Sequence, residues 1–540
     1  MPIRWSATPA YAPSPGRGRK RPRPAWTAAV AGAVCVVTVS SGAFATQPAT
    51  TPPAVDAVSP RPADHRITTE PGVALSATVH VPRRAAAGER PPLLVMPGTW
   101  AFGKAPYNTE ARHYADAGYL VVTYSPRGWG ASTGRIDSAG PRDVHDLSSV
   151  ITWAGRRLGV DLRRVGVLGY SYGAGIGLLG AASDPRIDAV AAMDGWADLE
   201  DTFFRHDTPA AFKASTQHGF ARLLGKPSDE MVEMKRALFS GRVPEHVRAW
   251  ARQRSPQQYV AALNAHRTAV FLVNHWTDTL LAPPDQIGHL FDSLDGPRHL
   301  EMRPGEHAEH GIYCLTGVRI DVCRRTQRWL DDHVRDQRTA VEDAAPFLLR
   351  PRQGNAEERH ADWRSMTARR ERSELLHHGP VTIRTGHGAG ADTGLPLLSP
   401  ALDKRGLPPL AVLPLLPRTT TAVWHAAGFT TAPTPLRGTT RVTVPVTPSA
   451  STGTFFVYLY EQDALGVGRL ISHAPYTFTD RAPGHRFTVT LDMHATAYDV
   501  PRGRRLAVVI DTEDLVYRSA NPAGARLTFG HPRLSLPLGP

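Results

Sequence analysis

The stretch Val165–Gly173 constrains the fold more than any other part of the sequence. An apolar run, Val165–Leu168, leads directly into Gly169-Tyr170-Ser171-Tyr172-Gly173, and a run of small residues, Ala174–Ala182, follows. Glycines flank the serine because side chains at those positions would collide with the neighbouring strand and helix of a strained strand–turn–helix unit. Such a unit lifts its serine above the end of a parallel β-sheet. The stretch therefore predicts a buried parallel sheet with Ser171 exposed at its edge.

Short apolar runs and helix-like stretches alternate on both sides of this turn. The runs expected to be strands are Val73–Val81, Leu93–Met96, Tyr119–Tyr124, Val165–Leu168, Ala189–Met193, Ala269–Val273 and Arg298–Met302. The expected helices between them are Asn108–Ala117, Val144–Arg157 and Ala174–Ala182. This alternation is typical of βαβ units. Together with the serine turn, it predicts an α/β-hydrolase core over residues 66–335.

Two regions depart from the alternation. Residues 197–266 hold helix-like stretches and no clear strand, which predicts a helical cap over the active-site end of the sheet. Residues 336–540 begin with a charged, irregular lead-in and continue, from about Val381, as short alternating segments with Pro and Gly turns. That pattern predicts an all-β sandwich as the C-terminal domain.

The N-terminal residues are typical of an export signal. Residues 1–45 carry six Arg or Lys and no acid, and their apolar stretch ends in Ala43-Phe44-Ala45. A basic region, an apolar region and a small-x-small site together predict a signal peptide over 1–45 and a secreted protein, followed by a linker over 46–65. The alternative is an uncleaved membrane anchor, because the apolar run is close to the length that spans a bilayer.

The net charge of +13 does not by itself predict a nucleic-acid partner. Six of these charges lie in residues 1–45, and the remaining bases are spread without runs that alternate with aromatic residues. We expect a mildly basic surface, no nucleic-acid partner and, once the signal is removed, no stable membrane association.

Two cysteines, Cys314 and Cys323, remain if the signal peptide leaves with Cys35. A pair of cysteines in an exported chain predicts a disulfide that closes a short loop. Two free buried thiols are the alternative.

A nucleophilic serine needs a base, and the base needs an acid that orients it. In an α/β-hydrolase the chain order is Ser, then Asp or Glu, then His, each in a loop after a strand. Asp278 follows the predicted strand Ala269–Val273, and His307 follows Arg298–Met302. We therefore predict Ser171, Asp278 and His307 as catalytic residues, with His310 as the alternative base.

The oxyanion of an acyl-transfer reaction needs two oriented donors. The backbone N–H of Tyr172, directly after the serine, is the first. The second is expected in the loop Pro97-Gly98-Thr99-Trp100 after an early strand, from the Thr99 N–H.

Two further patterns point to other sites and are discounted. Gly175–Gly180 spells G-x-G-x-x-G, but a dinucleotide site would place these glycines at the strand end, where Ser171 lies. Glu306 and Glu309 accompany His307 and His310, but no H-E-x-x-H or third ligand is evident. We expect neither a cofactor nor a metal.

Several segments, in this order, resemble the X-prolyl dipeptidyl aminopeptidase and cocaine esterase (CocE/NonD-type) family of serine hydrolases. The segments are Pro126–Ser132, Asp143–Asp146, the serine turn, Trp276–Asp278 with Pro283-Pro284, Pro304–His307, Trp329–His333, Tyr498–Gly503 and Asp511–Asn521. The resemblance implies a helical cap, a C-terminal jelly-roll domain and an acyl-enzyme intermediate. Members often carry a tyrosine on the early oxyanion loop where this chain has Thr99-Trp100, which leaves backbone donors alone or Tyr107 from nearby.

The predicted function is a secreted serine hydrolase of the X-prolyl dipeptidyl-peptidase type, acting on a small peptide. A carboxylic ester hydrolase or acylase is the alternative. From another class, an inactive protein that binds carbohydrate or cell wall is a further alternative. A dipeptidyl peptidase needs a carboxylate for the substrate's ammonium group, and Glu200, Asp201 and Asp207 at the start of the cap are the candidates. The oligomeric state is left open.

Overall fold

The protein is described from a computed structural model that covers most of the chain after residue 61. The described residues are 62–83, 90–240, 242–339, 345–354, 356–376, 379–386, 388, 390–395, 398–403, 407–428 and 430–540. The predicted signal peptide and residues 46–61 of the predicted linker lie outside them. Strand β1 (Ala63–Glu70) begins inside the predicted linker, so the first sheet starts before the expected boundary at residue 66.

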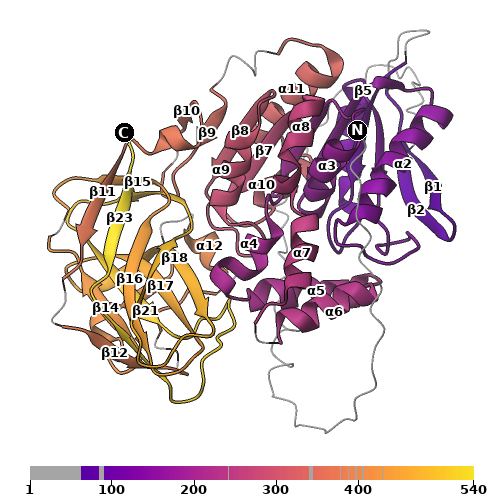
Figure 1. The fold of residues 1–540 in the computed structure, drawn as a ribbon. Coiled ribbons are helices and arrows are strands. Elements are labelled where there is room, and N and C mark those ends of the chain that lie inside the picture. The colour runs from indigo at the N-terminus through magenta and orange to yellow at the C-terminus, as the bar shows by residue number, and fades with distance from the viewer. Residues whose placement is uncertain are drawn as a thin grey trace, which may run out of the picture. The chain divides into compact units, whose positions relative to one another are not determined.

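A mixed β-sheet carries the first part of the described chain (Figure 1). Within the described residues, its strand order is β1-β2-β4-β3-β5-β6-β7-β8-β9-β10. The seven strands β3 to β9 run parallel to one another, while β1, β2 and β10 pair antiparallel at the two edges. The bounds are β2 (Val73–His80), β3 (Pro92–Pro97), β4 (Leu120–Tyr124), β5 (Asp161–Tyr170), β6 (Ala189–Met193), β7 (Ala269–His275) and β8 (Arg298–Arg303). The predicted α/β fold is confirmed.

Helices cover both faces of the sheet, which explains why β3, β4, β6 and β7 are buried at every position. Helices α1 (Asn108–Asp116) and α11 (Asp321–Arg335) share one buried cluster with the strands. Helices α2 (Pro141–Arg157), α3 (Tyr172–Ser183) and α9 (Pro284–Ser293) pack on the other face (Figure 1).

The connection from β6 to β7 is mainly helical in its described part and includes the region predicted as a cap. Its helices are α4 (Leu199–Phe204), α5 (Ala211–Leu224), α6 (Asp229–Leu238), α7 (Glu245–Gln253) and α8 (Val260–His266). Helices α5, α6 and α7 lie together beyond one end of the strands (Figure 1). Helix α8 instead packs against α3.

The sheet continues past residue 335, where we expected the first domain to end. Strand β9 (Phe347–Leu349) pairs parallel with β8, and β10 (Glu358–His360) pairs antiparallel with β9. Each of these strands is three residues long, too short for an apolar period to stand out in the charged lead-in.

The C-terminal part of the chain is an all-β domain of antiparallel sheets, as predicted. One sheet has the order β12-β22-β16-β23-β15-β20 with β11 and β19 attached, and the other has β13-β18-β17-β21-β14. A large apolar cluster fills the space between them. Their bounds are β11 (Arg369–Glu374), β12 (Val381–Arg384), β13 (Leu410–Val412), β14 (Ala422–His425), β15 (Thr434–Gly438), β16 (Arg441–Pro448), β17 (Gly453–Gln462), β18 (Val467–Phe478), β19 (Phe487–Asp492), β20 (Thr496–Val500), β21 (Arg505–Asp511), β22 (Arg526–Phe529) and β23 (Arg533–Leu538).

The cap contacts this β-domain through polar bonds. The Arg205 guanidinium donates to the Asp492 carbonyl of β19 at 3.1 Å, and it also pairs with Asp285 of α9 at 2.7 Å. The Phe212 N–H donates to the Val516 carbonyl at 2.9 Å. The Arg205 side chain is buried, so its bonds are shielded from water. These bonds hold one side of the cap against the β-domain.

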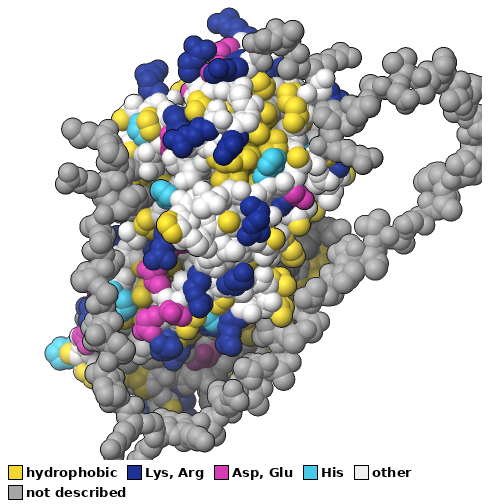
Figure 2. All heavy atoms as spheres, turned by 90° about the vertical axis from the view of Figure 1, so that its right-hand side faces the viewer, with side chains coloured by type: hydrophobic (Ala, Val, Ile, Leu, Met, Phe, Trp, Pro, Cys, Tyr) yellow, Lys and Arg dark blue, Asp and Glu magenta, His cyan; other side chains and the backbone are white. Residues whose placement is uncertain are grey.

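On the face shown in Figure 2, basic side chains lie among acidic and hydrophobic ones. Across the described residues, no helix combines the length and apolar character that crossing a membrane requires.

Candidate active site

Ser171 occupies a strained turn between β5 and α3. Its φ is +52° and its ψ is −112°, a conformation that non-glycine residues rarely adopt. A Cβ on Gly169 would lie 2.2 Å from the Gly173 carbonyl carbon, and a Cβ on Gly173 would lie 2.3 Å from the Pro97 carbonyl oxygen. Both positions therefore need glycine for close approach, as the sequence predicted.

Three predicted residues meet at this turn. The Ser171 hydroxyl donates to His307 Nε2 over 2.8 Å, and His307 Nδ1 donates to Asp278 Oδ2 over 2.8 Å. Asp278 lies in the loop after β7, and His307 in the loop after β8. The His307 side chain is 9% exposed and that of Asp278 is wholly buried, so the pair is shielded from bulk water.

The charges of the pair support each other. Burial alone would raise the pKa of Asp278, but His307 and Lys213 hold that pKa well below its usual range. Burial alone would lower the pKa of His307, but the Asp278 carboxylate raises it above the usual value. The second carboxylate oxygen, Oδ1, accepts from the N–H groups of Leu280 and Leu281 at 2.9 and 2.7 Å. These bonds fix the carboxylate toward the imidazole.

Glu306 joins the loops that carry Asp278 and His307. Its Oε1 accepts from the backbone N–H of His307 at 2.7 Å and from that of Thr279 at 2.8 Å. Burial and the neighbouring Asp278 raise the pKa of Glu306 to about 7. The sequence pattern suggested Glu306 only as a metal ligand. Its place directly before the histidine was the one signal for this role.

His310, the alternative base, takes part in a different network. Its Nδ1 lies 2.5 Å from His275 Nε2, and the two rings stack with centroids 4.8 Å apart. His275 Nδ1 lies 2.6 Å from Asp194 Oδ1. The structure thus brings His307, and not His310, to Ser171.

The two predicted oxyanion donors belong to residues that line the same cavity as Ser171. Tyr172 begins α3, and Thr99 follows β3. The Tyr172 hydroxyl bonds to the buried Asp143 carboxylate at 2.5 Å, which leaves its backbone N–H as the group beside Ser171. The indole N–H of Trp100, the next residue after Thr99 in its loop, donates to the Gln217 carbonyl at 3.0 Å.

Tyr107, the alternative oxyanion donor, lies elsewhere. Its side chain is wholly buried, belongs to the cluster beneath the sheet, and packs edge-on against Tyr170 with ring centroids 5.6 Å apart. It is not among the described residues that line the cavity.

A cavity of about 570 Å³ opens above Ser171 and His307. Cap helices and the α10 helix (Glu309–Leu315) form its walls. Most lining side chains are aromatic or aliphatic, and none of the described ones is Asp or Glu. The aromatic residues and methionines among them are Trp100, Phe102, Tyr170, Tyr172, Trp196, Phe203, Phe204, Phe220, Met231, Met234 and Trp250.

The three acids expected to bind an ammonium group are engaged with arginines. Glu200 accepts from Arg248 and Arg252 at 2.7 and 3.0 Å, and Asp207 pairs with Arg248. Asp201 lies 3.0 Å from Arg205.

The glycines of the G-x-G-x-x-G pattern pack inside α3. A Cβ on Gly175 would lie 2.1 Å from the Trp196 ring, and one on Gly180 would lie 2.4 Å from Leu147. Close packing therefore explains them. Where the structure describes the chain, it holds no group of three His, Cys, Asp or Glu side chains placed to hold a metal ion.

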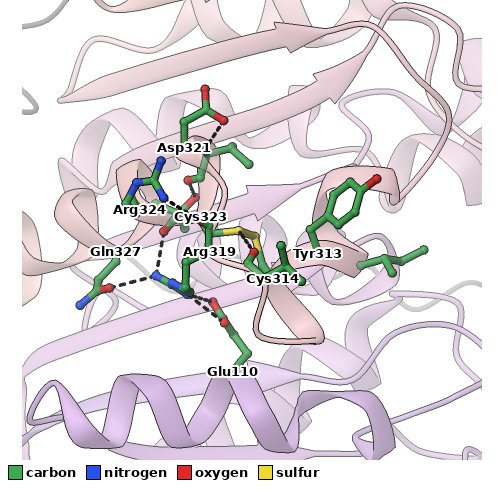
Figure 3. The surroundings of a disulfide bond; sticks show 12 residues. Glu110, Tyr313, Cys314, Arg319, Asp321, Cys323, Arg324 and Gln327 are labelled. Carbon is green, nitrogen blue, oxygen red and sulfur yellow. Dashed lines mark hydrogen bonds and ion pairs between the residues drawn. A yellow bond between two sulfur atoms is a disulfide. The ribbon is translucent and has the colours of Figure 1, made fainter. Parts of the chain in front are cut away.

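Cys314 and Cys323 form a disulfide directly after the His307 loop (Figure 3). The bond joins α10, which lines the cavity, to α11. Inside the closed loop, Arg319 pairs with Glu110 of α1 at 3.0 Å and donates to Gln327 at 2.9 Å. The disulfide and Arg319 thus attach α10 to the core.

Solved structures share this fold over most of the chain. An alpha-amino acid ester hydrolase superposes with a TM-score of 0.68 at 14% identity, covering 94% of this chain and all of that one. An aminopeptidase from a marine sediment Thaumarchaeota archaeon gives 0.67 at 14% identity, covering 92% and 99%. A CocE/NonD family hydrolase from Staphylococcus aureus gives 0.66 at 13%, covering 88% and 93%.

Sequence similarity to the first curated relative covers a much shorter part of the chain than the fold similarity does. A 31.7 kDa uncharacterized protein of Escherichia coli is 33% identical over 89 residues, which are 16% of this chain. The chain spans about a third of the length of that first relative.

Two family models match the two parts of the fold. The X-Pro dipeptidyl-peptidase (S15 family) model matches residues 71–309, and the X-Pro dipeptidyl-peptidase C-terminal non-catalytic domain model matches residues 411–534. Together they span more than half of the chain. The chain therefore belongs to the X-Pro dipeptidyl-peptidase (S15) family, and it is a serine hydrolase.

Proposed function

We propose that this serine hydrolase cleaves carboxylic esters through an acyl-enzyme on Ser171. The Ser171 oxygen attacks the ester carbonyl while its proton passes to His307 Nε2, and Asp278 stabilises the resulting imidazolium. The N–H groups of Tyr172 and Thr99 donate to the oxyanion. The departing alcohol takes the proton from His307, and water, deprotonated by the same imidazole, then releases the acid.

The lining of the cavity carries this proposal. A dipeptide substrate presents a charged ammonium group close to the scissile bond, and a buried cation is costly without a paired acid. The described lining residues include no Asp or Glu, and Glu200, Asp201 and Asp207 already pair with arginines. An apolar acyl or alcohol group needs no such partner and gains free energy from burial.

X-Pro dipeptidyl-peptidase activity is the second candidate, because both family models carry that description. It requires one of the arginine-bound acids of the cap to exchange its partner for the substrate.

The test compares hydrolysis of 4-nitrophenyl butyrate with that of Gly-Pro-4-nitroanilide. For each substrate, kcat/KM is divided by the rate of uncatalysed hydrolysis. We expect this quotient to be higher for the ester than for the anilide by about 10²-fold or more. The reverse order would replace the ester proposal by the peptidase. Labelling by a fluorophosphonate should be lost in Ser171→Ala and retained in Ser215→Ala, an exposed serine on α5 outside the cavity lining. Labelling that survives Ser171→Ala would contradict the role of Ser171.

We also propose that the chain is exported and its signal peptide removed after Ala45. The three-part pattern of residues 1–45 and the disulfide between Cys314 and Cys323 support this, because disulfides persist in oxidising compartments. N-terminal sequencing of protein from the medium of a secreting host should begin at Thr46. Intact residues 1–45 on membrane-bound protein would support an anchor instead.

A further inference from the structure

Three cap side chains that line the cavity carry a nitrogen atom for which no described residue supplies a partner. Lys235 of α6 makes no hydrogen bond or ion pair with any residue that the structure describes. His218 of α5 is 8% exposed, and its Nδ1 is buried without a partner. The Nε1 atom of Trp250 on α7 is also buried without a partner. The three side chains belong to one cavity, so its cap end is rich in donors.

The acids near this end are bound elsewhere. Glu233, two residues before Lys235, pairs with Arg236, and Glu230 contacts Arg254 at 3.5 Å. No described lining residue is Asp or Glu. The positive charge of Lys235 therefore has no counter-charge in the wall of the cavity.

The pKa shifts of Lys235 and His218 agree with the absence of acids from the described cavity wall. Burial and the nearby Arg222 lower the pKa of Lys235. Burial, Lys235 and Arg222 lower the pKa of His218. Both shifts are those of groups that meet other cations and no carboxylate.

Donors of this kind cost free energy while they lack an acceptor. A ligand that brings an acceptor recovers this cost, and the recovery is larger if the acceptor is charged. One ammonium, the Trp250 N–H and an imidazole that donates from its protonated nitrogen match a singly charged acceptor such as a carboxylate, whereas a dianion would leave one charge unpaired.

We infer that the esters cleaved at Ser171 carry a carboxylate, separated from the ester by an apolar body, which Lys235 and His218 bind at the cap end of the cavity. The inference rests on the proposed ester hydrolysis. The carboxylate can belong to the acyl group or to the alcohol, and the two arms of the experiment separate these sources.

In the acyl arm, mono-4-nitrophenyl esters of C6 to C10 dicarboxylic acids are compared with the same compounds capped as methyl esters. In the alcohol arm, 4-(hexanoyloxy)benzoate, whose free carboxylate lies on the alcohol part, is compared with its methyl ester. In one arm, we expect wild-type kcat/KM to be at least about tenfold higher for the carboxylate, mainly through KM, as for a charged hydrogen bond away from the reacting atoms. Equal values in both arms, or a preference for the neutral compounds, would overturn the inference.

Substitution of Lys235 then tests whether this residue causes the preference for carboxylate substrates. Lys235→Met removes the charge and keeps the length of the side chain, and we expect the ratio between carboxylate and neutral substrate to fall to about one. Lys235→Arg should keep the ratio above one. The matched control is Lys226→Met, which removes the same charge from an exposed cap position outside the cavity lining, and its ratio should equal that of the wild type. A ratio that falls equally in both Met variants would mean a general charge effect and would overturn the assignment.

A binding measurement keeps the inference testable if ester hydrolysis itself fails. Ser171→Ala is titrated calorimetrically with monomethyl azelate and with dimethyl azelate. We expect the monoanion to bind at least about tenfold more tightly, and to lose this advantage in Ser171→Ala combined with Lys235→Met. Equal affinities would overturn the inference, whereas absent ester turnover with retained selective binding would overturn only the proposed function.

Discussion

The Nε2 atom of His307 lies 2.8 Å from the Oγ atom of Ser171, although 136 residues separate them in the chain. The contact depends on two fixed supports. The glycine-flanked turn after β5 sets the position of Ser171, and bonds from Asp278 and Glu306 set that of the histidine loop. A nucleophile and base already within hydrogen-bond distance need little rearrangement before reaction.

This contact predicts different consequences for two neighbouring histidines. We expect His307→Gln to lower kcat/KM for 4-nitrophenyl butyrate by about 10³-fold or more, because no other base in the described part of the chain bonds to Ser171. His310→Gln should lower it by less than about tenfold, since His310 bonds to His275 instead. Steady-state kinetics on both purified variants measures this. The opposite ranking would assign the base to His310.

The raised pKa of His307 predicts a shifted pH profile. The imidazole must be neutral to accept the Ser171 proton, so kcat/KM should rise with pH through the His307 pKa, and the acid limb should lie above the ordinary value of about 6.5. Asp278→Asn removes the carboxylate that stabilises the imidazolium, so the limb should move to lower pH while its plateau falls by about 10³-fold or more. A limb that stays in place in Asp278→Asn would contradict the coupling.

Close packing at the turn predicts that Gly173→Ala is not tolerated. Its Cβ would overlap the Pro97 carbonyl oxygen, and we expect a loss of about 1–3 kcal/mol of folding free energy together with most of the activity. Gly219→Ala on α5 is the control, because a Cβ there meets nothing within 4 Å. That variant should gain about 0.5–1 kcal/mol. Urea denaturation of both variants checks the prediction, and equal effects would contradict it.

The disulfide predicts sensitivity to reductant. Cys314 and Cys323 are nine residues apart, and opening a loop of this length should lower the free energy of unfolding by about 2–3 kcal/mol. The double variant Cys314→Ala with Cys323→Ala should show this loss without reductant, and the wild type should approach it in dithiothreitol. An unchanged urea midpoint for reduced wild-type protein would show that the bond does not stabilise the fold.

Buried histidine between cap and β-domain predicts acid sensitivity. Burial, Lys213 and Arg205 lower the pKa of His473 to about 3. The unfolded chain binds a proton at His473 below about pH 6.5, while the folded state does so only near pH 3. The folded state should therefore lose about 1.4 kcal/mol per pH unit between these values from this group.

Urea midpoints between pH 7 and pH 5 measure this slope. His473→Gln should reduce the slope by about that amount, because Gln does not titrate. His145→Gln, at an exposed position, should leave it unchanged. A slope that is the same in His473→Gln and wild type would contradict the prediction.

Local pattern predicted most of the fold. The strands β6 and β7 begin where their apolar runs begin, at Ala189 and Ala269, because a parallel strand that is covered on both faces consists mainly of apolar residues. Strands of three residues, such as β9, were missed, since they are too short to show a period. The linker boundary was placed too late because β1 is largely exposed and carries charged residues.

The features of the site likewise divide into those that the local sequence predicts and those that only the tertiary structure decides. Ser171 was determined by its own sequence, because the glycine-flanked turn is a local requirement of backbone geometry. The sequence favoured His307 and left His310 as the alternative, and tertiary structure places His307 beside Ser171. The support from Glu306 and the distant place of Tyr107 were decided only by tertiary structure. The character of the cavity was decided there too, because its wall combines side chains from the cap, α10 and the loop after β3. Side chains brought together from separate elements leave no local pattern in the sequence, so only the packing of those elements determines which of them face the serine.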